Sequence, residues 1–309
     1  MKILIELPNW LGDAVMASPA IENLANYYSN SEITLIGSLT SIEIIKSHPQ
    51  VTKTYALSPK YIYSLKTIIN LNNFDIYLSF RGSLRAQIYK FLISAPMKYN
   101  FNKKKYPDVH QVEKYNNFVR EIIKTNVSPG SLILHNLVNK NIENKKKFLG
   151  LNPGASYGSS KRWYPEEFAN VAKALSNNFD VIIFGGPDEV RIAKDIETSL
   201  LKKGIKNYKN LAGKTSVAEL VDRIANLDLF ITGDSGPMHI AAAFQIPTVA
   251  VFGPTRDYET SQWKNKKSII LKKKLDCQPC MKRSCPLNHH NCMKLIKSSD
   301  ALDAIERIS

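Results

Sequence analysis

Residues 229–244 read LFITGDSGPMHIAAAF. The apolar run 229–232 predicts a buried strand, and the turn after it leads into a helix of small residues expected at 237–244. Pro237 suits the first turn of a helix because proline has no N–H to lose there. The helix start presents free N–H groups and the positive end of a dipole, which suit a diphosphate. This stretch predicts an α/β unit with an anion site at its turn.

The same alternation of short apolar runs and amphipathic stretches extends along all 309 residues. Expected strands lie at 2–7, 33–36, 53–57, 76–79, 148–152, 181–184, 229–232 and 248–252, and expected helices at 14–28, 40–47, 165–176, 188–202, 217–225 and 237–244. Strands alternating with helices favour parallel, doubly wound sheets. The polar, charged run 139–147 predicts a linker. The α/β fold therefore comprises two Rossmann-like domains, at 1–147 and 148–309, with the ligand expected in a cleft between them.

The formal net charge of +15 is distributed over both halves. A basic surface suits nucleic acid, acidic lipid or small anions. The sequence contains no recognisable nucleic-acid-binding module, and we expect no nucleic-acid partner. It has no run of about 20 apolar residues, and its first residues form an acid-containing strand rather than a secretion signal. We therefore expect a cytoplasmic protein.

Residues 7–16, LPNWLGDAVM, connect the first expected strand to the first expected helix. The ends of parallel strands face the ligand in doubly wound sheets. Gly12 permits a tight turn or the close approach of a substrate. Asp13 has two interpretations: it caps the helix, or it takes a proton from a sugar hydroxyl.

Residues 152–163, NPGASYGSSKRW, follow the first strand of the second half. Small residues let backbone amides approach an anion, and Lys161 supplies a point charge. The segment matches neither a triphosphate-binding nor a dinucleotide-binding glycine motif. The acids after residue 184 could hydrogen-bond ribose hydroxyls, or Asp188 could cap the next helix. At the third motif, Asp234 is explained equally well as a helix cap, whereas His239 near the expected anion has no structural explanation.

Together these segments resemble the ADP-heptose:lipopolysaccharide heptosyltransferase family, most closely its type II branch. The resemblance rests on residues 9–13, on 152–155 with 161–163, and on 234–243, in the family's order and spacing. Tyr164 before Pro165, and Ser159 with Ser160, depart from the common pattern without removing a charged group.

The resemblance implies a GT-B fold in which the N-terminal half binds the acceptor and the C-terminal half binds ADP-heptose. Asp13 would be the general base of an inverting transfer onto the first core heptose of heptosyl-Kdo-lipid A, Kdo being the core octulosonic acid. The implied donor-binding residues are Lys161, Glu189, Asp234, Ser235, Gly236, Pro237, Met238 and His239. The implied acceptor-binding residues are Asn9, Trp10, Gly12, Arg81 and Arg85.

The acceptor implies peripheral attachment to the inner face of the cytoplasmic membrane, for which Arg81, Arg85 and Lys103–Lys105 offer positive charge. No D-x-D acid pair follows a strand, so the predicted chemistry needs neither a metal nor a cofactor; a helix dipole and a lysine stabilise the leaving group.

Three alternatives remain open. A related heptosyltransferase could use another core acceptor, because the donor motif does not encode the acceptor. A nucleotide-sugar epimerase could use the same two-domain fold without an acceptor lipid. A non-enzymatic basic protein that binds membrane or nucleic acid would explain the charge, but it would leave Asp13, Lys161 and His239 without a role.

The cysteines form a C-x2-C-x4-C-x6-C pattern that also contains His289 and His290. Four thiols this close favour metal binding over disulfides in a cytosolic chain, with zinc or an iron–sulfur cluster as the metal. The alternative is a set of reduced, unliganded thiols. The four thiols are those of Cys277, Cys280, Cys285 and Cys292. Because both alternatives stay open, the predicted site residues include no metal ligand.

Overall fold

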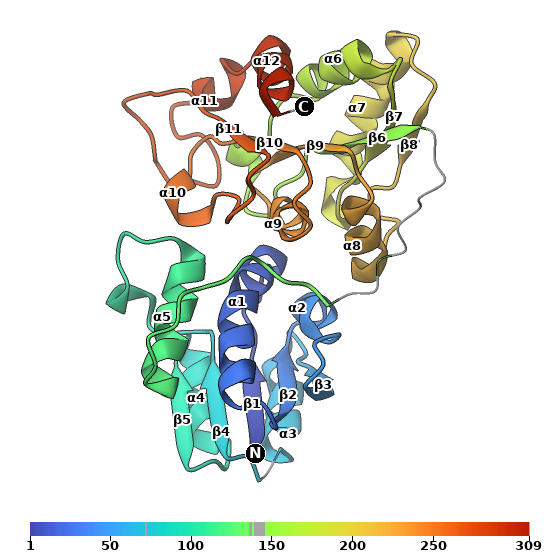
Figure 1. Cartoon of the computed structure of the whole chain (residues 1–309). Helices are drawn as coiled ribbons and strands as arrows, with labels where there is room; N and C mark the ends of the chain where they lie inside the picture. Colours follow the sequence, from blue (N-terminus) through green and yellow to red (C-terminus); the bar gives the residue numbers. More distant parts are fainter. Residues whose placement is uncertain (72, 136–137, 139–145, 309) are drawn as a thin grey trace. The chain divides into compact units, whose positions relative to one another are not determined.

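The computed structural model describes residues 1–71, 73–135, 138 and 146–308. The chain divides into two compact units, Met1–Asn136 (unit 1) and Leu137–Ser309 (unit 2) (Figure 1). Most of the predicted linker lies outside the described residues. Lys147, which we expected to close that linker, instead begins the first strand of unit 2.

Unit 1 is a parallel, doubly wound sheet with strand order β3-β2-β1-β4-β5. Its strands are β1 (Lys2–Glu6), β2 (Glu32–Gly37), β3 (Val51–Ala56), β4 (Ile76–Ser79) and β5 (Met97–Asn100). Its helices are α1 (Leu11–Tyr27), α2 (Leu39–Ile45), α3 (Tyr61–Ile69), α4 (Leu84–Leu92) and α5 (Gln111–Ile123), with a 3₁₀ turn, η1, at Lys103–Lys105. Helix α1 packs against α2 and α5, whereas α3 packs against α4. Right-handed crossovers put these two groups on opposite faces of the sheet.

Unit 2 is a second parallel sheet with strand order β11-β10-β9-β6-β7-β8. Its strands are β6 (Lys147–Asn152), β7 (Phe179–Ile183), β8 (Tyr208–Asn210), β9 (Leu229–Gly233), β10 (Thr248–Val251) and β11 (Ser268–Leu271). Its α-helices are α6 (Pro165–Leu175), α7 (Val190–Lys202), α8 (Val217–Ala225), α9 (Gly236–Ala243), α10 (Asp257–Thr260), α11 (Asn291–Lys294) and α12 (Ser298–Ile308), and its 3₁₀ turns are η2 (Ser159–Lys161) and η3 (Pro187–Glu189).

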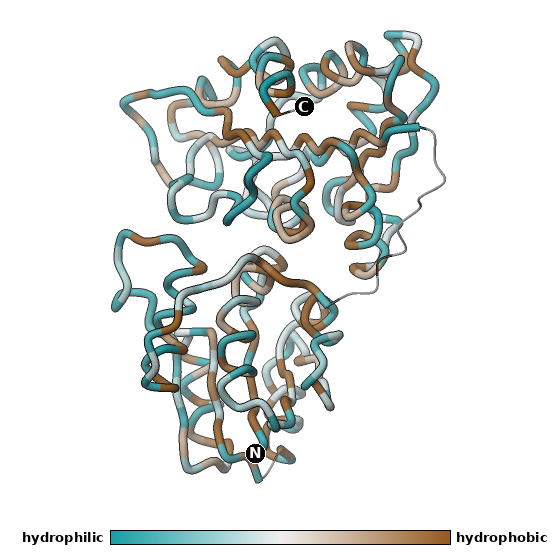
Figure 2. The backbone as a smooth tube through the Cα atoms, viewed as in Figure 1, coloured by the Kyte–Doolittle hydropathy of each residue, from teal (hydrophilic) through white to brown (hydrophobic). Residues whose placement is uncertain are grey.

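The hydrophobic core of each unit follows its central strands, which Figure 2 shows in brown along β9 and β10. Leu149, Ile231 and Val249 are completely buried in unit 2. Strands covered by helices on both faces must be apolar throughout, and for this reason the continuous apolar runs of the sequence identified them.

The predicted doubly wound α/β fold is confirmed, and the expected strands occur within two residues of their predicted ends. The sequence did not predict α3, α4, α5, α10, α11 and α12, nor the edge strands β5, β8 and β11. It also started the first helix at residue 14, whereas α1 begins at Leu11.

The strand order reverses between β1 and β4 in unit 1, and between β6 and β9 in unit 2. Ligands of doubly wound sheets bind beyond the carboxyl ends of the strands at such switch points. Each unit therefore has one edge at which to look for a site. Among the described residues, none of the helices has the length and apolar character needed to cross a bilayer.

Candidate active site

The switch point of unit 2 joins two of the predicted motifs through Asn152, the last residue of β6. Its side chain is almost fully buried, and Nδ2 donates to Ser235 Oγ at 2.9 Å and to Thr232 Oγ1 at 3.2 Å. Ser235 is the N-cap residue of α9. The amide therefore fixes the loop after β6 to the start of the helix that was expected to bind a diphosphate.

Lys161 and Asp234 form an ion pair at the same edge. Lys161 Nζ lies 2.5 Å from Asp234 Oδ2, and the two side chains are 12% and 6% exposed. Thr255 Oγ1 donates to the same Oδ2 at 2.6 Å. The interpretation of Asp234 as the cap of α9 is wrong, because the cap position belongs to Ser235. Asp234 instead holds the lysine, and Thr255, which the sequence analysis did not identify, holds Asp234.

The residues in the first turn of α9 differ in how deeply they are buried at this edge of the sheet. Gly236 and Pro237 are half-buried, and Pro237 lies in the first turn as predicted. The Met238 side chain is completely buried and packs with Ala250 and Phe252 in the core. His239 is 3% exposed. An anion at this turn would therefore meet backbone N–H groups rather than the methionine side chain.

Glu189 lies at the end of η3 and is 8% exposed. Its Oε2 accepts the Gly186 N–H at 2.7 Å, so the acid that caps this turn is Glu189 and not Asp188. The carboxylate lies against Gly154, where an added Cβ would come within 2.0 Å of the Glu189 carboxyl carbon. Only glycine fits at position 154 while Glu189 keeps this place beside the loop after β6.

The loop that contains Lys161 rests on residues 281–290. Ser160 donates its N–H to Arg283 O at 3.1 Å and its Oγ–H to Lys282 O at 2.5 Å. Tyr157 OH donates to Met281 O at 2.6 Å, and Lys161 Nζ lies 4.8 Å from the centre of the Tyr157 ring. The cysteine-containing segment therefore supports the loop that positions the lysine.

Cys277, Cys280 and Cys285 are half-buried, and Cys292 is buried. Burial, with a smaller effect of the three neighbouring thiols, raises the pKa of the Cys292 thiol to about 11. A thiol with this pKa is protonated near neutral pH.

Three side chains of unit 1, those of Glu22, His48 and His135, are of the kinds that bind metals. One oxygen or nitrogen atom of each lies within 4.8 Å of the others. His135 Nε2 lies 2.5 Å from Glu22 Oε1, and His48 Nε2 lies 3.4 Å from it. The Gln50 N–H donates to His48 Nδ1, so neutral His48 carries its proton on Nε2. A metal-bound Nε2 would need the opposite tautomer. The geometry of the three side chains fits a hydrogen-bonded cluster rather than a metal site.

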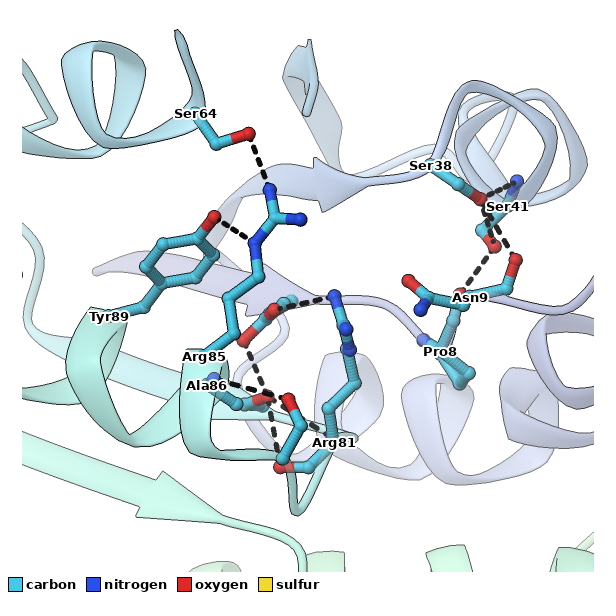
Figure 3. A network of polar contacts seen from close by, with 12 residues as sticks. Pro8, Asn9, Ser38, Ser41, Ser64, Arg81, Arg85, Ala86 and Tyr89 are labelled. Atoms are coloured by element: carbon cyan, nitrogen blue, oxygen red, sulfur yellow. Dashed lines mark hydrogen bonds and ion pairs between the residues drawn. The ribbon is translucent and has the colours of Figure 1, made fainter. Parts of the chain in front are cut away.

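In unit 1, the loop after β1 is held by the start of α2. Ser38 Oγ donates to Asn9 O at 3.1 Å, and Ser41 Oγ donates to Pro8 O (Figure 3). Asn9 and Trp10 are exposed, and Trp10 is 54% exposed. The loop backbone is fixed while its side chains remain accessible to a ligand.

Asp13 is the third residue of α1, and Trp10 occupies the N-cap position. The interpretation of Asp13 as an N-cap is therefore wrong. Gly12 and Asp13 are half-buried. Burial, together with the nearby charge of Asp13, raises the pKa of Tyr115 well above its ordinary value. The carboxylate thus lies in the first helical turn, where the dipole favours an anion, beside an aromatic side chain of α5.

Arg81 follows β4 across the switch point from β1. Its Nη1 lies 3.2 Å from Oε1 of Glu6, a completely buried acid that also accepts from Tyr77 OH at 2.8 Å and Ser79 Oγ at 2.7 Å. Burial and the adjacent carboxylate raise the pKa of Tyr77. Arg81 is thereby anchored at the carboxyl edge of the sheet, and Glu6, missed in the sequence, is its anchor.

Arg85 lies on α4 and uses its guanidinium within unit 1 (Figure 3). It donates to Tyr89 OH, to Ser64 Oγ and, at 3.0 Å, to Ser58 O. These contacts occupy Nε and Nη2. An acceptor that bound Arg85 would have to share the guanidinium with these partners.

Two Rossmann-like units, each a parallel, doubly wound sheet, are the architecture of the GT-B class of glycosyltransferase fold. The fold is shared with a glycosyltransferase family 9 structure from Veillonella parvula, at TM-score 0.82 and 20% identity over 99% of this chain and 96% of that one. It is shared as well with the Escherichia coli ADP-heptose LPS heptosyltransferase II, at TM-score 0.80 and 21% identity over 100% and 98% of the two chains.

Sequence comparison identifies the family. The family model described as "Glycosyltransferase family 9 (heptosyltransferase)" matches residues 62–291. A lipooligosaccharide heptosyltransferase 2 from Campylobacter jejuni is 39% identical over 100% of this chain and 99% of its own length. The chain belongs to glycosyltransferase family 9. It is a glycosyltransferase, as the motif resemblance implied, and not an epimerase or a non-enzymatic basic protein.

Proposed function

We propose that this enzyme transfers L-glycero-D-manno-heptose from ADP-heptose to the first heptose of heptosyl-Kdo-lipid A in the lipopolysaccharide inner core. The full-length, 39% identical match to a lipooligosaccharide heptosyltransferase 2 carries the proposal. A second full-length relative of the same name, also from Campylobacter jejuni, is 39% identical. The proposed chemistry uses no metal and no cofactor.

The donor would bind at the switch point of unit 2. The anchored ammonium of Lys161, beside the start of α9, supports a diphosphate site there. The N–H groups present in residues 235–239, where Pro237 has none, would surround the phosphates, and Asp234 would hold the lysine in place. Glu189, at the neighbouring strand end, would accept a hydrogen bond from the ribose.

In the proposed transfer, Asp13 takes the proton of the acceptor hydroxyl as its oxygen attacks the anomeric carbon of the donor. The new C–O bond forms on the face opposite the phosphate, and the bond from the anomeric carbon to the phosphate oxygen breaks. ADP leaves with that electron pair and is stabilised by Lys161 and the helix dipole. The configuration at the anomeric carbon is inverted.

The acceptor would bind at the switch point of unit 1. Exposed Asn9 and Trp10 support a sugar-binding loop, and Gly12 would let the sugar approach Asp13. Arg81 and Arg85 would meet the anionic groups of the acceptor. This acceptor would require the enzyme to work at the inner face of the cytoplasmic membrane, where Lys103–Lys105 would add electrostatic attraction.

The test is mass spectrometry of purified heptosyl-Kdo-lipid A after incubation with the enzyme and ADP-heptose. We expect a gain of one heptose with stoichiometric release of ADP. Transfer to another core acceptor, with none to this one, would overturn the acceptor assignment. Absence of ADP-heptose binding would overturn the donor assignment.

A further inference from the structure

Helices α3 and α4 cover one face of the unit 1 sheet and present apolar side chains on their outer side. On α3, Ile62, Tyr63 and Ile69 are 73%, 58% and 59% exposed. On α4, Leu84 and Phe91 are 78% and 83% exposed. We call these five residues the α3–α4 face.

The apolar character of this face is not required by the core. The inner sides of the two helices are formed by other residues, and Ile68, Ala86 and Tyr89 are completely buried. Helices on a protein surface ordinarily carry polar residues on the outer side. Exposed apolar side chains gathered on one surface mark a place of interaction.

The two helices are tied into one surface. Arg85 of α4 donates to Ser64 of α3 and to the Ser58 carbonyl in front of α3. Its guanidinium carbon lies 5.8 Å from the centre of the Tyr61 ring and 5.3 Å from that of Tyr89. The arginine fixes α3 beside α4, so the exposed side chains of the α3–α4 face belong to a single surface.

The charged residues on and beside the α3–α4 face are all positive. Neither Tyr61–Ile69 nor Leu84–Leu92 contains an acid. Lys60 and Lys66 are exposed, and Lys90 is half-buried beside the apolar residues. A second copy of the chain would bring these lysines against their equivalents with no acid between them. The charge therefore disfavours self-association through this face and suits an anionic partner.

We propose that the α3–α4 face docks on the surface of an anionic lipid bilayer. Its apolar side chains enter the boundary between head groups and acyl chains, and Lys60, Lys66 and Lys90 meet lipid phosphates. The proposal rests on the proposed function, since an enzyme whose acceptor is a lipid gains by residing at the bilayer. It assigns attachment to apolar insertion by two helices, and not to basic residues alone.

The test measures sedimentation of the full chain with vesicles of phosphatidylcholine mixed with phosphatidylglycerol, an anionic lipid that gives the bilayer a negative surface potential. The test variant is Ile62→Gln with Phe91→Gln, and its matched control is Val190→Gln with Leu201→Gln, which removes two exposed apolar residues of α7 in unit 2. We expect the test variant to bind at least about tenfold more weakly and the control to bind as the parent does.

A charge variant, Lys66→Glu with Lys90→Glu, separates lipid charge from general stickiness. Its binding should fall on phosphatidylglycerol vesicles, and the parent should bind pure phosphatidylcholine weakly. Equal binding by the parent and both variants would overturn the proposal. A concentration-dependent dimer in sedimentation velocity that disappears in the Ile62→Gln, Phe91→Gln variant would assign the face to a second copy and would equally overturn it.

Activity assays distinguish failure of this proposal from failure of the proposed function. The Ile62→Gln, Phe91→Gln variant should keep the parent's turnover on a water-soluble, deacylated acceptor and lose rate on acceptor held in vesicles. Unchanged vesicle binding together with an unchanged rate on vesicle-held acceptor would overturn the docking proposal. A parent that binds vesicles through this face but transfers no heptose to either acceptor would overturn the proposed function alone.

Discussion

Lys161 Nζ lies 2.5 Å from Asp234 Oδ2, although 73 residues separate the two in the sequence. The loops after β6 and β9 bring them together at the switch point of unit 2. A lysine held this way keeps its charge at a defined position with little rotamer freedom left to lose. The ion pair would accordingly hold the ammonium in place for the proposed diphosphate.

Replacing Lys161 with Met should destabilise unit 2 by about 3 kcal/mol, because Asp234 would be left charged in a mostly buried position. ADP binding, measured by isothermal titration calorimetry, should be lost as well. Urea unfolding gives the stability. The control Lys203→Met breaks a surface pair with Glu166 and should cost under about 1 kcal/mol.

The double variant Lys161→Met, Asp234→Asn separates structure from binding. It should recover much of the stability because no buried charge is left unpaired, yet it should still fail to bind ADP. Normal ADP affinity in either Lys161 variant would remove the lysine from the donor site.

Asp13→Asn should fold normally and lose at least about 100-fold in turnover, because an amide cannot take the acceptor proton. The measurement is ADP release under saturating substrates, with circular dichroism to verify folding. Glu43→Gln, which changes an acid on α2 that pairs with Lys46, serves as the control and should keep its rate. Near-normal turnover of Asp13→Asn would disprove the role of general base.

The hydrogen-bonded cluster of Glu22, His48 and His135 should make the free energy of unfolding of unit 1 sensitive to acid. Burial lowers the pKa of His48, with Glu22 opposing and His135 assisting the shift. The unfolded chain therefore binds more protons than the folded chain as the pH falls below about 6.5, and the free energy of unfolding declines in that range.

The measurement compares urea unfolding at neutral and mildly acidic pH for the parent and for His48→Gln. Glutamine keeps a donor towards Glu22 but does not titrate, so the pH dependence should be reduced. His289→Gln, at an exposed position, should leave it unchanged. An identical pH profile in the parent and in His48→Gln would contradict the assignment.

Cys292 should be the slowest of the four thiols to react with iodoacetamide at pH 8. Its pKa of about 11 leaves little thiolate at that pH, and burial blocks access. Peptide mass spectrometry over time gives the order of modification, and all four thiols of urea-unfolded protein should react at similar rates. Early modification of Cys292 in the folded protein would show that the thiol is ionised or accessible.

The omitted helices show where pattern reasoning fails. Helix α3 buries Ser64 and Ile68 but exposes Ile62, Tyr63 and Ile69, so the polarity of its residues does not indicate which side faces the core. The cap assignments failed for a related reason: Asp13 and Asp234 stand beside helix starts, but the N-cap residues are Trp10 and Ser235. A residue's position next to a predicted helix start therefore determines neither where the helix begins nor which group its side chain contacts.

The sequence by itself determined the alternation of strands and helices, the three motifs and the residues in them, because apolar runs, glycines and prolines act over a few neighbouring residues. Only the tertiary structure decided what those residues contact. Arg81 bonds to Glu6, and Ser160 rests on Lys282 and Arg283, since the strand order and the path of the loops bring together residues that are remote in the chain. Spacing along a sequence does not state that order, which depends on how the right-handed crossover connections place successive strands in each sheet.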